Sequence, residues 1–138
     1  MNVYFIFSLK EEFKQLYLNN ERVLYSILKQ LYHMDKEELN YGFNLFSQLT
    51  NPIPKNKIDQ KIFIELHQNI PYSKKGEIHY INNLYKDEIS RLQIKNSYLK
   101  LETEQNFSSF FPIIAKFSNN FFVCNFYKQD YFFLEQES

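Results

Sequence analysis

The chain has 138 residues, the length of one domain, and 44% of them are hydrophobic. Aromatic residues make up 19%, which excludes an intrinsically disordered chain, because such chains have few aromatic residues and a high net charge. Sixteen basic and sixteen acidic side chains cancel. This balance argues against nucleic acid as the main partner, because neutralising phosphates requires an excess of Lys and Arg.

The single cysteine, Cys124, leaves no possibility of an internal disulfide and indicates a reducing compartment. The first residues lack the pattern of a signal peptide. No stretch reaches the roughly 20 apolar residues that a membrane-spanning helix requires. We therefore expect a cytoplasmic protein that does not contact membranes.

The chain opens with a predicted strand and a predicted helix. Residues 3–7 are β-branched or aromatic and uncharged, which indicates a strand buried on both faces. Ser8 and Glu11 have the spacing of a capping box and predict a helix over residues 9–18. The apolar positions of this helix have the spacing of an amphipathic core stripe: Leu9, Phe13, Leu16 and Tyr17.

Two further helices are expected before residue 54. The first spans residues 21–34, with a broad apolar face made by Val23, Leu24, Ile27, Leu28 and Leu31. Asp35 can cap the second, with Glu38 as its capping partner. Its apolar stripe consists of Leu39, Phe43, Phe46 and Leu49. Residues 51–54 contain two prolines and end this helix.

The middle of the chain is less regular. Residues 61–66 fit either a strand or a helix stabilised by tertiary contacts, and both possibilities stay open. Residues 71–76 have the composition of a loop, and residues 77–81 fit a strand or an irregular segment. Strict alternation of apolar and polar residues over 91–95 and 98–102 predicts a β-hairpin.

The last third is expected to add a helix and two strands. The helix spans residues 106–118, although Pro112 lies inside it. Its predicted buried side comprises Phe107, Phe110, Phe111, Ile114 and Phe117. Strands follow at 121–126 and 131–134. The whole chain, residues 1–138, is thus predicted to be a single α+β domain. An N-terminal strand and helices precede a mostly antiparallel sheet with a C-terminal ββαββ segment.

No residue pattern indicates catalysis. His33, His67 and His79 fall in three different predicted elements, without the spacing of a metal site. Cys124 lies in an apolar strand without an adjacent base, as a buried structural cysteine does. The only glycines, Gly42 and Gly76, exclude the glycine-rich loops that cradle phosphates. We expect no enzyme activity, cofactor, metal or small-molecule substrate.

Phe13 and Tyr17 leave two alternatives open. Side chains four residues apart lie on one helix face, so both rings can belong to the core. Alternatively, Leu9 and Leu16 already supply the core stripe, and the two rings, with Glu12 and Lys14 beside them, have the composition of an interface.

The abundance of aromatic residues has a second possible use, the stacking of single-stranded bases. That mode needs a basic groove beside the rings, whereas here acidic residues interleave with the rings as often as basic ones do. We keep a single-stranded nucleic-acid-binding module as the alternative function.

The order of elements resembles that of the sporulation inhibitor of replication (SirA) family over nearly the whole chain. The aromatic first strand and the segment 9–17, with its Phe13 and Tyr17, carry the resemblance. The other matching features are the stop at residues 52–54, the Phe110-Phe111 helix, the strand 121–126 and the aromatic strand that begins at Tyr131.

The resemblance implies a non-enzymatic inhibitor that binds the N-terminal domain of the replication initiator DnaA and blocks initiation during sporulation. The family's partner-binding Phe and Tyr fall on Phe13 and Tyr17. A polar residue of the third helix also contributes in the family, but its position here holds Leu45. Asn44 and Gln48 are near, and the role is not transferred to either. Phe132 and Phe133 stand where a Trp would be expected beside Tyr131.

Overall fold

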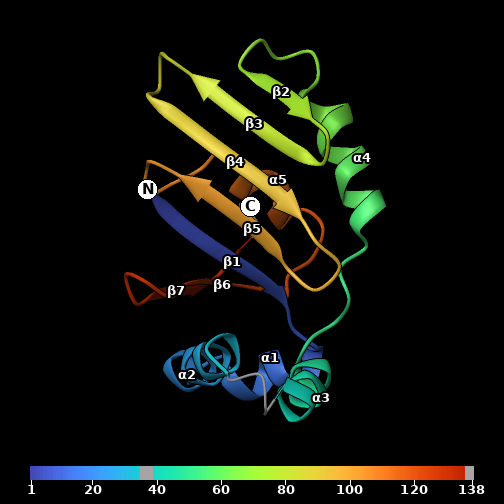
Figure 1. The fold of residues 1–138 in the computed structure, drawn as a ribbon, viewed down its shortest axis with the longest axis vertical. Helices are drawn as coiled ribbons and strands as arrows, with labels where there is room; N and C mark the ends of the chain where they lie inside the picture. The colour runs from blue at the N-terminus through green and yellow to red at the C-terminus, as the bar shows by residue number, and fades with distance from the viewer. Residues whose placement is uncertain (35–38, 136–138) are drawn as a thin grey trace.

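A computed structural model of the chain describes residues 1–34 and 39–135, except the side chains of residues 39–41. One antiparallel sheet of seven strands organises it, in the order β2-β3-β4-β5-β1-β6-β7 (Figure 1). The strands are β1 (Asn2–Ser8), β2 (Tyr72–Lys75), β3 (Ile78–Asn83), β4 (Glu88–Ile94), β5 (Leu99–Thr103), β6 (Phe121–Asn125) and β7 (Asp130–Phe133). The helices are α1 (Glu11–Tyr17), α2 (Glu21–Tyr32), α3 (Leu39–Leu49), α4 (Lys55–Leu66) and α5 (Phe110–Ala115).

The N-terminal strand lies inside the sheet and is buried on both faces, as predicted. β1 pairs with β5 on one side and with β6 on the other. Because side chains alternate across a strand, Tyr4 and Ile6 enter one hydrophobic cluster while Phe5 and Phe7 enter another. The predicted α+β class, with the first strand joining an antiparallel sheet, is confirmed.

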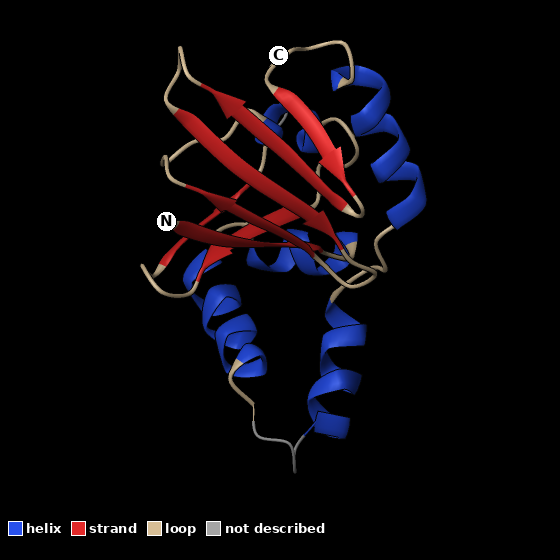
Figure 2. Cartoon of the chain, turned by 45° about the horizontal axis from the view of Figure 1, so that its top comes forward, coloured by secondary structure: helices blue, strands red, loops and turns tan. Residues whose placement is uncertain are grey.

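Helices cover both faces of the sheet (Figures 1 and 2). The cluster beneath α4 and α5 includes Ile6, Ile58, Ile62, Leu92, Phe110 and Ile114. The cluster on the side of α1, α2 and α3 is richer in aromatic rings and includes Phe5, Phe7, Leu24, Leu28, Phe122 and Phe126. We refer to these as the aliphatic face and the aromatic face.

The predicted hairpin at 91–102 and the two C-terminal strands are confirmed as β4–β5 and β6–β7. The prediction of a loop at residues 71–76 is wrong, because β2 spans most of this segment and pairs with β3. Only Tyr72 of this short edge strand is buried, so its sequence carries no apolar alternation. Residues 77–81, left open between strand and irregular structure, belong largely to β3.

The helix boundaries also differ in places. Residues 61–66, left open between strand and helix, are the second half of α4. The helix predicted at 106–118 is limited to α5, and Phe107 is exposed. The helix predicted at 21–34 ends at Tyr32. The predicted cap by Asp35 and Glu38 lies outside the described residues.

Candidate partner-binding surface

Helix α1 follows β1 after two residues and is held at its start by backbone contacts. The amide of Leu9 donates to the carbonyl of Asn120, and the amide of Lys10 donates to that of Leu49, both at 3.0 Å. Leu9 also forms a β-bridge with Thr50. These contacts join the start of α1 to the end of α3 and to the segment before β6, so the position of the first turn of the helix is fixed.

The start of α1 differs from the capping-box prediction. Ser8 belongs to β1, and the N-cap position is Lys10, which makes no side-chain hydrogen bond to the helix. Glu11 and Glu12 occupy the first turn, where the helix dipole favours acidic side chains. Leu9 is fully buried, but as a residue of the bridge and not of the helix.

Helix α1 buries none of its side chains, although it carries three large apolar residues. Phe13 and Tyr17 are half-buried, and Leu16 is 60% exposed. Residues three and four apart are neighbours on a helix surface, so Phe13, Leu16 and Tyr17 form one partly exposed apolar strip. Tyr17 also packs against the cluster of the aromatic face.

The prediction that Leu16 lies on the core stripe of this helix is wrong. The space beneath the helical layer is filled by Leu9 and by two α2 side chains, Leu24 and Leu28, each of which is at most 1% exposed. The predicted stripe included Leu9, which shifted the expected buried side of the helix. Leu16 therefore enlarges the exposed apolar strip.

Charged and polar groups surround this strip. The Gln15 side chain donates to Glu11 at 2.9 Å, and Lys14 donates from Nζ to the carbonyl of Asn119 at 2.5 Å. Hydrogen bonds from Gln15 and Asn120 lower the pKa of Glu11. An apolar centre with a polar rim is the usual composition of a protein–protein interface.

Helix α3 ends beside the start of α1 and contributes polar side chains nearby. Asn44 and Gln48 are both exposed, while Leu45 is half-buried. The structure therefore leaves both polar residues available to a partner, and it does not distinguish between them.

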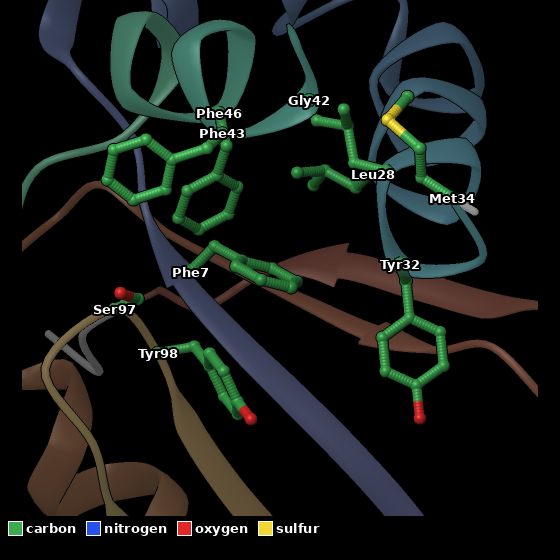
Figure 3. Close-up of a pocket in the computed structure, with 10 residues that line it drawn as sticks. Phe7, Leu28, Tyr32, Met34, Gly42, Phe43, Phe46, Ser97 and Tyr98 are labelled. Carbon is green, nitrogen blue, oxygen red and sulfur yellow. The ribbon is translucent and has the colours of Figure 1, made fainter. Parts of the chain in front are cut away.

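An apolar cavity of about 300 Å³ lies between α2 and α3 and was not foreseen from the sequence (Figure 3). Phe43, which the helical pattern assigned to the buried stripe, lines it and is 68% exposed. Met34 lies across from Gly42, where a Cβ atom would come within 2.4 Å of the Met34 sulfur. Gly42 therefore leaves room for the side chain of Met34, which follows the end of α2.

The histidines and the cysteine form no common site. His79 is fully buried between Asp59 and Tyr72, whereas His33 and His67 are exposed on other elements. Among the described residues, no three His, Cys, Asp or Glu side chains gather closely enough to hold a metal ion. Cys124 is fully buried, and burial raises the pKa of its thiol strongly, which keeps it protonated and unreactive.

Comparison with protein families identifies a match that covers most of the chain. The family model described as sporulation inhibitor of replication protein SirA matches residues 2–137, nearly the whole chain. The chain belongs to the SirA family. A search of curated proteins finds no match. The predicted membership is confirmed, and it identifies the chain as a sporulation inhibitor of replication, a class of regulatory protein that acts on a protein partner in replication initiation.

Within residues 1–34 and 39–135, no helix combines the length and the apolarity needed to cross a bilayer.

Proposed function

We propose that this SirA-family chain inhibits replication initiation by binding the N-terminal domain of DnaA through α1, with Phe13 and Tyr17 as the central contacts. The observation that carries the proposal is that α1 has no buried side chain despite its three large apolar residues. Helices that serve only the fold bury an apolar stripe, and α2 does so with Leu24, Tyr25 and Leu28. An exposed apolar strip with a polar rim matches the composition of a binding surface.

The proposed mechanism is occlusion and requires no chemistry. An initiator domain that recruits other proteins is inactivated when a small folded protein covers its recruiting surface. A standard interface buries about 800 Å² on each partner, and a few central aromatic residues supply most of its binding energy. The proposed inhibitor is therefore not an enzyme.

The test is a calorimetric titration of the chain with the isolated N-terminal domain of DnaA. We expect saturable binding that Phe13→Ala and Tyr17→Ala each weaken by about 2 kcal/mol or more, the scale of a hot-spot residue. Phe13→Ala is the cleaner probe, because Tyr17 also contacts the core cluster and its removal will lower stability as well.

The matched control is Phe63→Ala on α4. Phe63 is 44% exposed, so its removal also deletes a partly exposed ring, but from a helix on the opposite face of the sheet. We expect Phe63→Ala to bind like the wild type. If wild-type chain does not bind the domain, the proposed partner is wrong; if Phe13→Ala and Tyr17→Ala bind normally, the proposed site is wrong.

A further inference from the structure

A second cleft lies at the end of the sheet near the C-terminus of α2 and shares no residue with α1. It has a volume of about 780 Å³, within the usual range for small-molecule sites. The start of β1, the turn between β6 and β7 and the end of α2 enclose it, and Figure 1 shows these segments on one side of the molecule.

The lining of this cleft is cationic. Lys29 of α2, Lys100 of β5 and Lys128 of the β6–β7 turn contribute ammonium groups, and His33 adds an imidazole. None of the described residues that line it carries a carboxylate. In a chain whose formal net charge is zero, this local excess of positive charge attracts anions.

Contacts within the protein balance the charges of these lysines only in part. Lys29 lies in the last turn of α2, where a cation is favoured by the helix dipole. Lys100 Nζ lies 3.8 Å from one carboxylate oxygen of Glu102, and Arg91 Nη1 lies 3.9 Å from the other. One carboxylate therefore faces two cations and neutralises only one of their charges. Lys128 is exposed on the turn, and its side chain has no ion pair within the described part of the chain.

Aromatic rings accompany the cations. Tyr32 stacks on Phe126 with ring centroids 4.9 Å apart and planes 19° apart, and Phe5 packs against both rings. Tyr32 remains 52% exposed above this floor, and Tyr127, next to Lys128, is 93% exposed. Base–aromatic stacking beside lysines is the arrangement with which proteins hold single-stranded nucleic acid.

We propose that this cleft binds a nucleotide, with its phosphate held by Lys29, Lys100 and Lys128 and its base stacked on the exposed rings of Tyr127 and Tyr32. The nucleotide is either a free mononucleotide or one unit of a single strand, since both present the same base and phosphate. The overall charge argues against nucleic acid, but the fold gathers cations here that lie far apart in the sequence.

The experiment titrates the full chain with a labelled oligothymidylate of about ten nucleotides, a length within the range of known single-strand sites. We expect saturable binding, and the logarithm of the binding constant should fall with the logarithm of salt concentration with a slope of about −0.7, as for one neutralised phosphate of a single strand. Unlabelled thymidine monophosphate is then added as a competitor. Displacement identifies a free mononucleotide as sufficient, and binding of the strand alone identifies the single strand as the ligand.

Two sets of variants locate the site. The triple variant Lys29→Gln, Lys100→Gln and Lys128→Gln should weaken binding at least about tenfold and flatten the salt dependence. The control triple Lys57→Gln, Lys61→Gln and Lys86→Gln removes the same charge outside the cleft and should change the affinity less than about twofold.

Tyr127→Ala should weaken binding about fivefold or more, the lower end for one stacked base. Its control, Tyr85→Ala, removes another fully exposed tyrosine, on the β3–β4 turn, and should have no effect.

Three outcomes would overturn the proposal. Wild-type protein that binds neither probe at low salt has no such site. Equal weakening by the two lysine triples would indicate non-specific attraction. If the first triple abolishes binding but Tyr127→Ala does not weaken it, the cleft holds a simple anion and not a nucleotide. None of these results depends on the initiator domain, so the proposed function is tested separately.

Discussion

The two faces of the sheet hold their helices in different ways. On the aliphatic face, buried polar groups fix α4 and α5 to particular strands. On the aromatic face, α1 is fixed by backbone contacts at its start, and its apolar side chains remain partly or mostly exposed. One face therefore holds its helices by buried polar contacts, while the other leaves apolar side chains of a helix exposed.

On the aliphatic face, His79 joins α4 to the edge hairpin β2–β3. Its Nε2 lies 2.8 Å from Asp59 Oδ1, and its Nδ1 lies 2.8 Å from the hydroxyl of Tyr72. An ionised carboxylate can only accept, so Nε2 donates, and Nδ1 of the neutral ring accepts from Tyr72. Burial and the charge of Asp59 raise the pKa of Tyr72 to about 12, so its hydroxyl keeps the proton that it donates.

A second network on this face caps α5 from a distant strand. Glu88 of β4 is 4% exposed and accepts from the Ser90 hydroxyl at 2.6 Å and from the Ser109 amide at 3.0 Å. Burial by itself would raise the pKa of Glu88, but hydrogen bonds from Ser109, Ser90 and Ser108 outweigh it and lower that pKa. A carboxylate at the start of a helix is favourable, so β4 fixes the position of α5.

The largest expected effect is the difference in stability between a variant that loses a ring of α5 and a variant that loses a ring of α1. Phe110 is fully buried, and Phe110→Ala should lower the free energy of unfolding by about 3–5 kcal/mol. Phe13→Ala should cost much less, because Phe13 is only half-buried. Urea unfolding of both variants measures the difference. Equal costs would mean that α1 belongs to the core as fully as α5 does.

The next effect concerns the Asp59–His79–Tyr72 chain. Asp59→Ala leaves the buried Nε2–H of His79 without its acceptor and should cost about 1–3 kcal/mol. The control is Glu65→Ala on the same helix, whose ion pair with Lys116 is at the surface and is worth at most about 1 kcal/mol. Thermal unfolding of both variants compares them. If Asp59→Ala is as stable as Glu65→Ala, the buried chain does not hold α4.

The pH dependence of stability should show a smaller effect of the same residues. Burial lowers the pKa of His79, and the hydrogen bond and charge of Asp59 only partly offset this, while Lys74 and Lys55 lower it further. Because the folded pKa is below the unfolded value of 6.5, the unfolded chain binds the proton first. The stability contributed by neutral His79 is therefore complete above pH 6.5 and is lost as pH falls towards the folded pKa.

Urea unfolding between pH 7.5 and pH 5 measures this loss, and His79→Gln, which cannot titrate, should reduce the slope over that window. Glu88 affects stability only at lower pH. Its pKa is lower in the folded protein than the unfolded value of 4.5, so the stability that its ionised form contributes is lost only as pH falls below about 4.5. An unchanged slope in His79→Gln would assign the pH dependence to other groups.

Local pattern was sufficient to predict much of this fold. The uncharged strand at 3–7, the alternating hairpin at 91–102 and the proline stop after α3 all follow from short-range rules. β2 could not be predicted in this way, because a four-residue edge strand with one buried side chain has almost no pattern. The extent of α5 depends on Glu88, which lies 21 residues before Ser109 in the sequence.

The candidate surfaces, too, could be predicted from the sequence only in part. Phe13 and Tyr17 came from the family resemblance, and helical spacing alone could not decide whether they belong to the core. Leu16 was assigned to the core because Leu9 was counted as part of the helix, whereas the bridge to Thr50 removes Leu9 from it. The cationic cleft combines α2, β5 and the β6–β7 turn, and only the paired sheet brings these segments together.

The smallest expected effect on stability, and the sharpest test of the comparison, concerns Leu16. Because this side chain is 60% exposed, Leu16→Ala should change the free energy of unfolding by no more than about 0.5 kcal/mol. The control is Leu24→Ala on α2, which removes the same atoms from a fully buried position and should cost about 2–5 kcal/mol. If the exposed strip contacts the proposed initiator domain, Leu16→Ala should also weaken that binding by about 1 kcal/mol or more. Thermal unfolding and a titration with the initiator domain measure both quantities on the same samples. A large loss of stability in Leu16→Ala would show that this residue belongs to the core. The contrast between an exposed apolar helix on one face and buried helices on the other would then no longer hold.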